Sequence, residues 1–502
     1  MISFVHNDDA TAPLAFVRPG HAQADYLQWV DWIMETPVDT YAAHAASPFE
    51  CYYPTAIGQT YGRKASARTD LEERATLILD ELQRAGTDPL RIQADRVHER
   101  GKRFLAAIRM SDAHYQWSWC GGPPDFFVEH PEWRIRKTDG TTDWYMDYAI
   151  PEVRAHIFAI ITEIAENYPI DGLELDFMRF CVHFQRPATA EQIETMTGFV
   201  RQIRSLLDRV AADRGRTDRL ALGTRVPAML ADCAPNGLDP AAWAREGLVD
   251  YLNPCQWLFA DYTIPMDDYA AAIKGSDCRI LYSIQPRAMA DWGEPQTQLA
   301  RAFSIGLAEF RALAAVAHAA GADGLHTFNV CCEFPERREE MQAALHAMGS
   351  VSDIYAGPRH YQNLPADADG SDGLSGTVRW QILRFTPADV NAPQRFVFQT
   401  GEQGRNARGS LSWRIFGSVP ADQWRFRLNG VLLPDHAVAA SHRLQEGKDP
   451  GAGKGLPEHM HFEVDLVTAP ALGFRNELEI TALALGEEPQ THVMSVLEVW
   501  AE

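Results

Sequence analysis

Eight short apolar segments alternate with amphipathic stretches over the first 350 residues, and this alternation restricts the fold more than any other feature of the chain. Residues 70–86 and 151–168 repeat apolar side chains at the i, i+3, i+4 spacing of a helix with one buried face. Eight strand–helix units in this length predict a (β/α)8 barrel. An open doubly wound sheet is the alternative, but no GxGxxG motif follows the first segment to support it. We expect the barrel strands at 2–7, 38–45, 103–110, 171–178, 220–226, 249–257, 279–285 and 323–330.

The composition changes near residue 351, which predicts a second domain. Residues 351–374 are polar, aperiodic and rich in Gly, Pro and Asp, as is typical of a connecting segment. Residues 375–502 contain short alternating runs with turn signals, among them Asn429-Gly430 between apolar flanks. We therefore predict a barrel over 1–350, a linker over 351–374 and an all-β sandwich over 375–502. The sandwich would be a carbohydrate-binding module or a structural partner of the barrel.

Charge and cysteine content limit the partners and the compartment. The 46 Lys+Arg and 68 Asp+Glu residues are spread along the chain and give a net charge of -22, which argues against nucleic acid or an anionic membrane as partner. No apolar run reaches the length of about 18 residues that a membrane span needs. The eight cysteines are scattered without a CxxC pair, so neither a zinc site nor a disulfide framework is indicated. We expect a cytoplasmic protein, or a secreted or periplasmic one if a leader has been removed; an oligomer of identical chains stays open.

The segment IDGLELDFMRF, residues 170–180, places two carboxylates in a strand that is otherwise apolar. Because side chains alternate along a strand, Leu173 and Leu175 would face the helices while Glu174 and Asp176 face the barrel axis. Asp176 would lie near the carboxyl end of the strand, where active sites of such barrels gather. The alternative is that both acids are ion-paired with Arg109 or Arg225 inside the barrel.

The spacing Asp171-Gly172-x-x-x-Asp176 resembles the fourth-strand motif of α-amylase-type retaining glycoside hydrolases, in which the last aspartate is the nucleophile. The segment also resembles the chitinase motif DGxDxDxE, but Met178 stands where that family has its acidic glutamate. The order and spacing of ISFVHNDD, RGKRFLAAIRMSDAH, HPEWRI, IDGLELDFMRF, GLVDYLNPCQW and ADGLHTFNV resemble the mostly bacterial glycosyl-hydrolase-like barrels described as similar to family 10. This resemblance implies a glycoside hydrolase acting on an oligosaccharide or polysaccharide, without a metal or cofactor.

Glycoside cleavage needs one carboxyl group to protonate the leaving oxygen and another to act as nucleophile or base. We expect Asp176 in the second role. Asp112 is the preferred proton donor, because its loop also carries His114, Trp117 and Trp119; a loop or helix-cap role is the alternative for Asp112. The α-amylase pattern would place the donor at the end of the fifth strand, where this chain has Arg225. Other candidate donors are Glu174, Asp8 or Asp9, Asp261 and Glu333.

Further polar and aromatic residues near the predicted strand ends would bind the substrate. Arg109, Arg179, Arg225 and Arg287 would suit a uronic or sulfated sugar, because guanidinium groups bind oxyanions in a bidentate manner; pairing with the acids named above is the alternative. The other expected substrate-binding residues are Asn7, Asp8, His44, His114, Trp119, Gln256, Trp257, Gln285, His326, Asn329 and Glu333.

Two alternatives to a glycoside hydrolase stay open. His44, His114 and His326, together with Glu174 and Asp176, could bind a divalent metal in a sugar isomerase or lyase, although no HxH or HExxH motif supports this. A barrel that binds carbohydrate without cleaving it is the second. The absence of GxSxG disfavours a Ser-His-Asp hydrolase.

Overall fold

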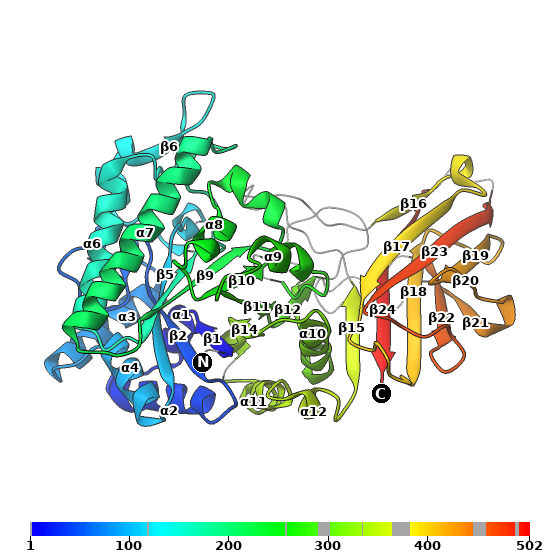
Figure 1. Ribbon diagram of the computed structural model, residues 1–502, viewed down its shortest axis with the longest axis horizontal. Helices are drawn as coiled ribbons and strands as arrows, with labels where there is room; N and C mark the ends of the chain where they lie inside the picture. Colours follow the sequence, from blue (N-terminus) through cyan, green and yellow to red (C-terminus); the bar gives the residue numbers. More distant parts are fainter. Residues whose placement is uncertain are drawn as a thin grey trace.

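The chain forms a closed barrel followed by a β-sandwich (Figure 1). The computed structural model describes residues 3–117, 120–256, 259–289, 302–333, 335–363, 382–444, 458–486 and 491–502. Eight strands pair in parallel, each with the next, and β14 pairs with β1 to close the ring. The predicted (β/α)8 barrel is therefore confirmed. Its strands are β1 (Phe4–Asp8), β2 (Thr40–Ala46), β5 (Arg103–Arg109), β8 (Gly172–Asp176), β9 (Ala221–Pro227), β10 (Tyr251–Cys255), β11 (Arg279–Ile284) and β14 (Gly324–Phe328).

Helices surround the barrel in Figure 1 and cover the apolar outer face of its strands. Local sequence signals set where several of them begin. Thr69 and Glu72 form a capping box at the start of α3, and Pro151 occupies the first turn of α6. The helices are α1 (Thr11–Phe16), α2 (Ala22–Met34), α3 (Asp70–Arg84), α4 (Pro89–Glu99), α6 (Pro151–Asn167), α7 (Ala190–Asp213), α8 (Pro240–Arg245), α9 (Met266–Ala272), α10 (Leu307–Ala319) and α11 (Arg338–Ala347).

The barrel interior combines small apolar side chains with a polar layer. Val5, Ala42, Leu105 and Leu281 form an apolar cluster there, together with Ala107 and Tyr251. Gly223 on β9 leaves the space that the Tyr251 ring occupies, since a Cβ atom at Gly223 would lie 1.9 Å from that ring. The interior is therefore a packed core, and any site must lie above it, at the carboxyl ends of the strands.

Two short extensions rise from the carboxyl face of the barrel. After a register shift between His44 and Ala46, the chain turns back as β3 (Glu50–Cys51), which pairs with the end of β2, and β4 (Gln59–Thr60) follows. The loop between β5 and α6 contains α5 (Asp125–Glu129) and the hairpin of β6 (Arg134–Arg136) and β7 (Thr142–Met146). The label β6 marks this hairpin at the top of Figure 1.

The C-terminal domain is a sandwich of two antiparallel sheets, as the sequence predicts. Its core contains Trp413, whose ring centroid lies 4.8 Å from that of Phe426 and 5.8 Å from that of Phe462. One sheet contains β15 (Arg359–Asn363), β24 (His492–Ala501), β18 (Gly409–Phe416), β22 (His459–Asp465) and β21 (Val438–Arg443), with β16 (Leu383–Phe385) beside β24. The other contains β17 (Pro393–Gln399), β23 (Arg475–Ala484), β19 (Gln423–Leu428) and β20 (Val431–Leu432).

The segment 351–374 is predicted to connect the domains, and its described part has regular structure. It contains α12 (Val351–Ile354) and the strand β15, while residues 364–374 lie outside the described ranges. His360 Nδ1 on β15 forms a hydrogen bond of 2.8 Å with Glu309 at the start of α10. The sandwich is thus joined to the barrel by side-chain contacts as well as by the chain. Among the described helices, none combines the length and apolar character needed to cross a membrane.

Candidate active site

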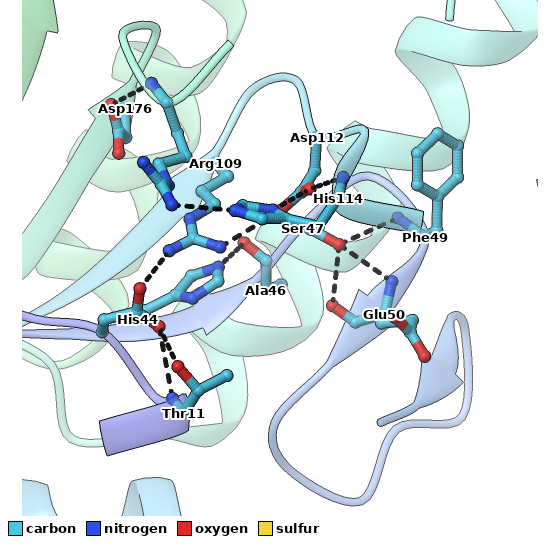
Figure 2. Close-up of polar contacts among 12 residues, drawn as sticks. Thr11, His44, Ala46, Ser47, Phe49, Glu50, Arg109, Asp112, His114 and Asp176 are labelled. Atoms are coloured by element: carbon cyan, nitrogen blue, oxygen red, sulfur yellow. Dashed lines mark hydrogen bonds and ion pairs between the residues drawn. The ribbon is translucent and has the colours of Figure 1, made fainter. Parts of the chain in front are cut away.

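A cavity of about 320 Å³ opens beside the carboxyl ends of the first four barrel strands. Its walls come from the loops that follow β1, β2, β5 and β8, so residues far apart in the sequence meet there. Figure 2 shows the polar contacts among several of them. Ionisable lining residues are Asp9, Glu50, Lys64, Glu72, Arg109, Asp112, His114 and Arg179, and the aromatic ones include Phe49, Tyr52, Tyr61 and Tyr115.

Arg109 lies between two aspartates in this cavity. Its Nη2 atom is 2.8 Å from Asp9 Oδ2, and its Nη1 atom is 3.2 Å from Asp112 Oδ2. Burial alone would raise the pKa of both carboxyl groups. Arg109 lowers the pKa of Asp9 below its ordinary value, and His114 and Arg109 together lower that of Asp112. Both aspartates are therefore ionised over the whole neutral and mildly acidic range.

His114 links Asp112 to Arg179, and Figure 2 shows its contact with Asp112. The imidazole Nδ1 lies 2.5 Å from Asp112 Oδ1, and Nε2 lies 2.8 Å from Arg179 Nη2. Because a guanidinium group can only donate, Nε2 must accept, and the single ring proton belongs on Nδ1. Burial also lowers the pKa of His114. The imidazole is thus neutral at pH 7, and its Nδ1–H group donates a hydrogen bond to Asp112.

Glu50 has the opposite protonation state. It lines the cavity from β3, and its Oε1 atom is buried without a hydrogen-bond partner among the described residues. Burial raises the pKa of Glu50 to about 8, and Lys64 offsets only part of this effect. Glu50 therefore carries a proton at pH 7, in the same cavity as the ionised Asp112.

Aromatic rings and a buried ion pair complete the cavity walls. Tyr52 and Tyr61 are stacked, with ring centroids 4.6 Å apart and planes inclined by 25°. Lys64 and Glu72 form an ion pair in which both side chains are buried, and Lys64 Nζ also donates to the Gly122 carbonyl at 2.7 Å. These contacts give the cavity flat apolar faces next to fixed charges, which suits a sugar with its apolar C–H face and polar edge.

Asp176 faces the barrel interior, as expected, but it does not line this cavity. Its Oδ2 atom accepts a hydrogen bond of 2.6 Å from Arg225 Nη1, while Oδ1 accepts from the backbone N–H groups of Met178 at 2.9 Å and Arg179 at 3.1 Å. The side chain of Asp176 is 3% exposed and that of Arg225 is 0% exposed. This is the ion-paired arrangement that the sequence left open for Asp176, and it fixes the backbone that presents Arg179 to the cavity.

Glu174 lies one layer deeper and is likewise fully paired. It accepts hydrogen bonds from Asn7 Nδ2, from the Tyr251 hydroxyl and, at 2.7 Å, from His326 Nε2. Burial would raise its pKa, but the contacts with His326 and Tyr251 lower it to about 2. Asn7, Glu174 and His326 thus form a polar layer of the barrel core and not an open binding site.

Two other predicted substrate-binding residues, Asp8 and His44, form hydrogen bonds inside the protein. Asp8 points toward the helices, where it accepts hydrogen bonds from Trp29 Nε1 at 2.6 Å and from the Tyr41 hydroxyl. His44 is buried, and its Nε2 atom lies 3.0 Å from the Ala46 carbonyl oxygen. Burial lowers the pKa of His44 to about 3, so the ring is neutral and donates to that oxygen.

The predicted residues after β10, β11 and β14 form a second polar group, which does not line the cavity. Gln256 Nε2 donates to Asp261 at 3.2 Å, and Gln285 donates to the Gln256 carbonyl at 2.7 Å. Arg287 and Glu333 approach to 3.7 Å. Asn329 is a buried residue of positive φ at the end of β14. Trp119 and Trp257 lie outside the described residues.

Of the residues predicted for the site, the cavity thus brings together Asp9, Arg109, Asp112, His114 and Arg179. Sequence reasoning missed Glu50. A signal was present, because Glu50 follows the second strand by a few residues and all strand ends share one face of the barrel. Within the described residues, no three His, Cys, Asp or Glu side chains form a group that could hold a metal ion.

Comparison with known proteins relates part of the chain to a glycosyl-hydrolase-like family. Residues 58–198 match the family described as Glycosyl hydrolase-like 10, which confirms the resemblance expected from the sequence. The proteins named Glycosyl hydrolase DigH from Escherichia coli strains K12 and O157:H7 are each 24% identical over 257 residues, which is 42% of this chain and 56% of those proteins. The chain therefore spans about half the length of the curated relatives that it matches.

Two solved structures were also found to be similar to this chain. An α-L-fucosidase isoenzyme from Paenibacillus thiaminolyticus is 14% identical with a TM-score of 0.42, over 72% of this chain and 51% of that one. A chitinase from Cycas revoluta is 12% identical with a TM-score of 0.42, over 70% of this chain and 99% of that one.

Proposed function

We propose that the chain hydrolyses glycosidic bonds in the 320 Å³ cavity, with Glu50 as the proton donor and Asp112 as the nucleophile or base. The observation that carries the proposal is the presence of both carboxyl groups in the lining of one cavity, where Asp112 contacts Arg109 and His114 while Glu50 Oε1 is buried without a hydrogen-bond partner among the described residues. A pair of carboxyl groups whose environments drive their pKa values apart is what acid and base catalysis of glycoside cleavage requires. The match to a glycosyl-hydrolase-like family supports the same reaction.

In this mechanism, Glu50 donates its proton to the leaving oxygen as the glycosidic bond breaks. Asp112 Oδ2, which among the described residues accepts one long hydrogen bond of 3.2 Å, from Arg109, attacks the anomeric carbon or removes a proton from the attacking water. His114 and Arg109 keep Asp112 ionised and fix its orientation. The configuration of the released sugar distinguishes the two roles of Asp112, since direct attack retains the configuration and water attack inverts it.

An anionic sugar is the substrate class that we propose. Arg179 lines the cavity next to Arg109, and burial together with the charge of Arg109 lowers the pKa of Arg179 to about 10. A carboxylate or sulfate group on the substrate would stabilise both guanidinium groups. This charge arrangement favours a saccharide that contains a uronic acid or a sulfated sugar unit.

The proposal is tested by replacing each carboxyl group with its amide. Glu50→Gln and Asp112→Asn should each lower the release of reducing ends by at least about 100-fold, because each removes an acid–base or nucleophilic step. Glu129→Gln, an exposed glutamate of α5, is the matched control and should leave the rate unchanged. Polygalacturonate oligosaccharides and chitin oligosaccharides supply anionic and neutral substrates. Tight binding by the wild-type chain with no release of reducing ends would identify a carbohydrate-binding protein instead.

A further inference from the structure

An exposed tryptophan lies next to the cavity and has no role in the chemistry proposed above. Trp144, on β7 of the hairpin in the β5–α6 loop, is 42% exposed. The other large apolar side chains of this hairpin, Ile135, Tyr145 and Met146, are buried. Val128, which follows Phe127 in the chain, is also exposed, at 54%. Two exposed apolar side chains are far less than the broad patch that a protein surface needs, so the indole suits a small apolar face.

The indole of Trp144 is held in place by the residues beneath it. Its ring is stacked on Phe127, with centroids 6.0 Å apart and planes inclined by 12°. The Arg134 guanidinium carbon lies 3.7 Å from the centroid of the same Phe127 ring. The Tyr115 hydroxyl donates to the Trp144 carbonyl oxygen. A rigid aromatic surface loses little conformational entropy when a ligand stacks on it.

One aromatic ring, that of Tyr115, separates Trp144 from the cavity. Its centroid lies 5.9 Å from that of Tyr115, and Tyr115 lines the cavity. The ring centroid of Tyr115 also lies 5.7 Å from that of Phe49, another lining residue. A sugar chain that leaves the cavity over Tyr115 therefore reaches Trp144 within the span of two adjacent rings.

We infer that Trp144 is a stacking platform for a second pyranose unit, next to the unit bound in the cavity. The ligand class is an oligosaccharide or polysaccharide chain, in contrast to a single sugar on a small leaving group. The inference rests on the proposed function for the identity of the cavity, but it concerns binding and not cleavage. The apolar C–H face of the pyranose would lie on the indole, while its hydroxyl groups stay in solvent.

The test measures polymer binding separately from hydrolysis in the 502-residue chain. Native gels that contain polygalacturonate, dextran or glycol chitin report polymer affinity from the retardation of the protein. All variants are made on the Glu50→Gln background, which keeps the polymer intact. Adding Trp144→Ala should weaken binding to the retarding polymer at least tenfold, whereas Trp144→Phe should preserve most of it. Binding of the corresponding monosaccharide 4-nitrophenyl glycoside should change less than twofold.

Trp500 is the matched control, because it is 39% exposed but lies on β24 of the sandwich. Trp500→Ala should leave retardation unchanged. The inference is overturned if Trp144→Ala binds polymer as its parent does, if it loses monosaccharide binding equally, if Trp500→Ala loses retardation instead, or if no polymer retards the chain. If Glu50→Gln still hydrolyses glycosides while Trp144→Ala weakens polymer binding, the proposed proton donor is wrong and the platform stands.

Discussion

Asp176 Oδ2 accepts a hydrogen bond of 2.6 Å from Arg225 Nη1, and both side chains are buried at the carboxyl end of the barrel. This pair accounts for a charged residue on a strand that otherwise consists of core residues. It also means that the aspartate of the DGxxxD spacing is paired within the barrel, while the ionised aspartates that line the cavity are Asp9 and Asp112. The two assignments for Asp176 lead to different experimental results.

Removing Asp176 should destabilise the barrel. Asp176→Ala leaves Arg225 as a buried charge without its carboxylate, which costs about 3–5 kcal/mol. The measurement is the free energy of unfolding of the barrel in urea. The double variant Asp176→Leu with Arg225→Met should recover most of the loss, because it removes both charges together. If Asp176→Asn keeps wild-type stability but loses hydrolysis more than a thousandfold, Asp176 is the nucleophile and the assignment to Asp112 is contradicted.

The Glu174 layer should make the fold sensitive to acid. Its folded-state pKa of about 2 lies below the ordinary value of 4.5, so its stabilising effect is complete above pH 4.5 and is lost as the pH falls toward 2. The shift corresponds to on the order of 3 kcal/mol. The difference in unfolding free energy between wild type and Glu174→Gln should therefore be largest at pH 7 and shrink by that amount near pH 2. A difference that does not vary with pH would contradict the hydrogen-bonded carboxylate.

The rate of hydrolysis should fall at alkaline pH, because Glu50 loses its proton there. A proton donor is active only while protonated, so kcat/KM should fall tenfold per pH unit above about 8. On the acid side, activity should persist below pH 4, because the pKa of Asp112 is held below its ordinary value. The measurement is the pH profile of kcat/KM on an oligosaccharide, because a sugar leaving group needs the proton that Glu50 would supply. An alkaline limb near pH 5 would show that Glu50 is not the donor.

Arg179 should determine the preference for an anionic sugar. Arg179→Gln removes one of the two guanidinium groups in the cavity and should raise KM for uronic acid substrates about tenfold or more, while KM for the neutral counterpart changes less than threefold. Arg287→Gln is the matched control, since Arg287 does not line the cavity. Equal losses on charged and neutral substrates would indicate that Arg179 only supports the structure.

The barrel could be predicted from the sequence because each strand is an apolar run followed by a helix with one apolar face, and both patterns are local. The inward direction of Glu174 and Asp176 also followed from alternation along β8. The partner of Asp176 could not be selected, because Arg225 lies 49 residues away and Arg109 satisfied the same pattern. Glu50 was not predicted, because its position depends on a chain reversal that has no local sequence pattern. After the register shift at the end of β2 the chain turns back as β3, and this reversal brings Glu50 into the cavity.

The most direct test of the central claim compares leaving groups in the Glu50→Gln variant. A 2,4-dinitrophenyl leaving group needs no proton, whereas an alkyl or sugar leaving group does, so loss of the donor should affect only the second kind. We expect Glu50→Gln to lower kcat/KM at least 100-fold on an oligosaccharide and less than tenfold on the corresponding 2,4-dinitrophenyl glycoside. Equal reductions on both substrates, or no reduction on the oligosaccharide, would contradict a catalytic acid at Glu50.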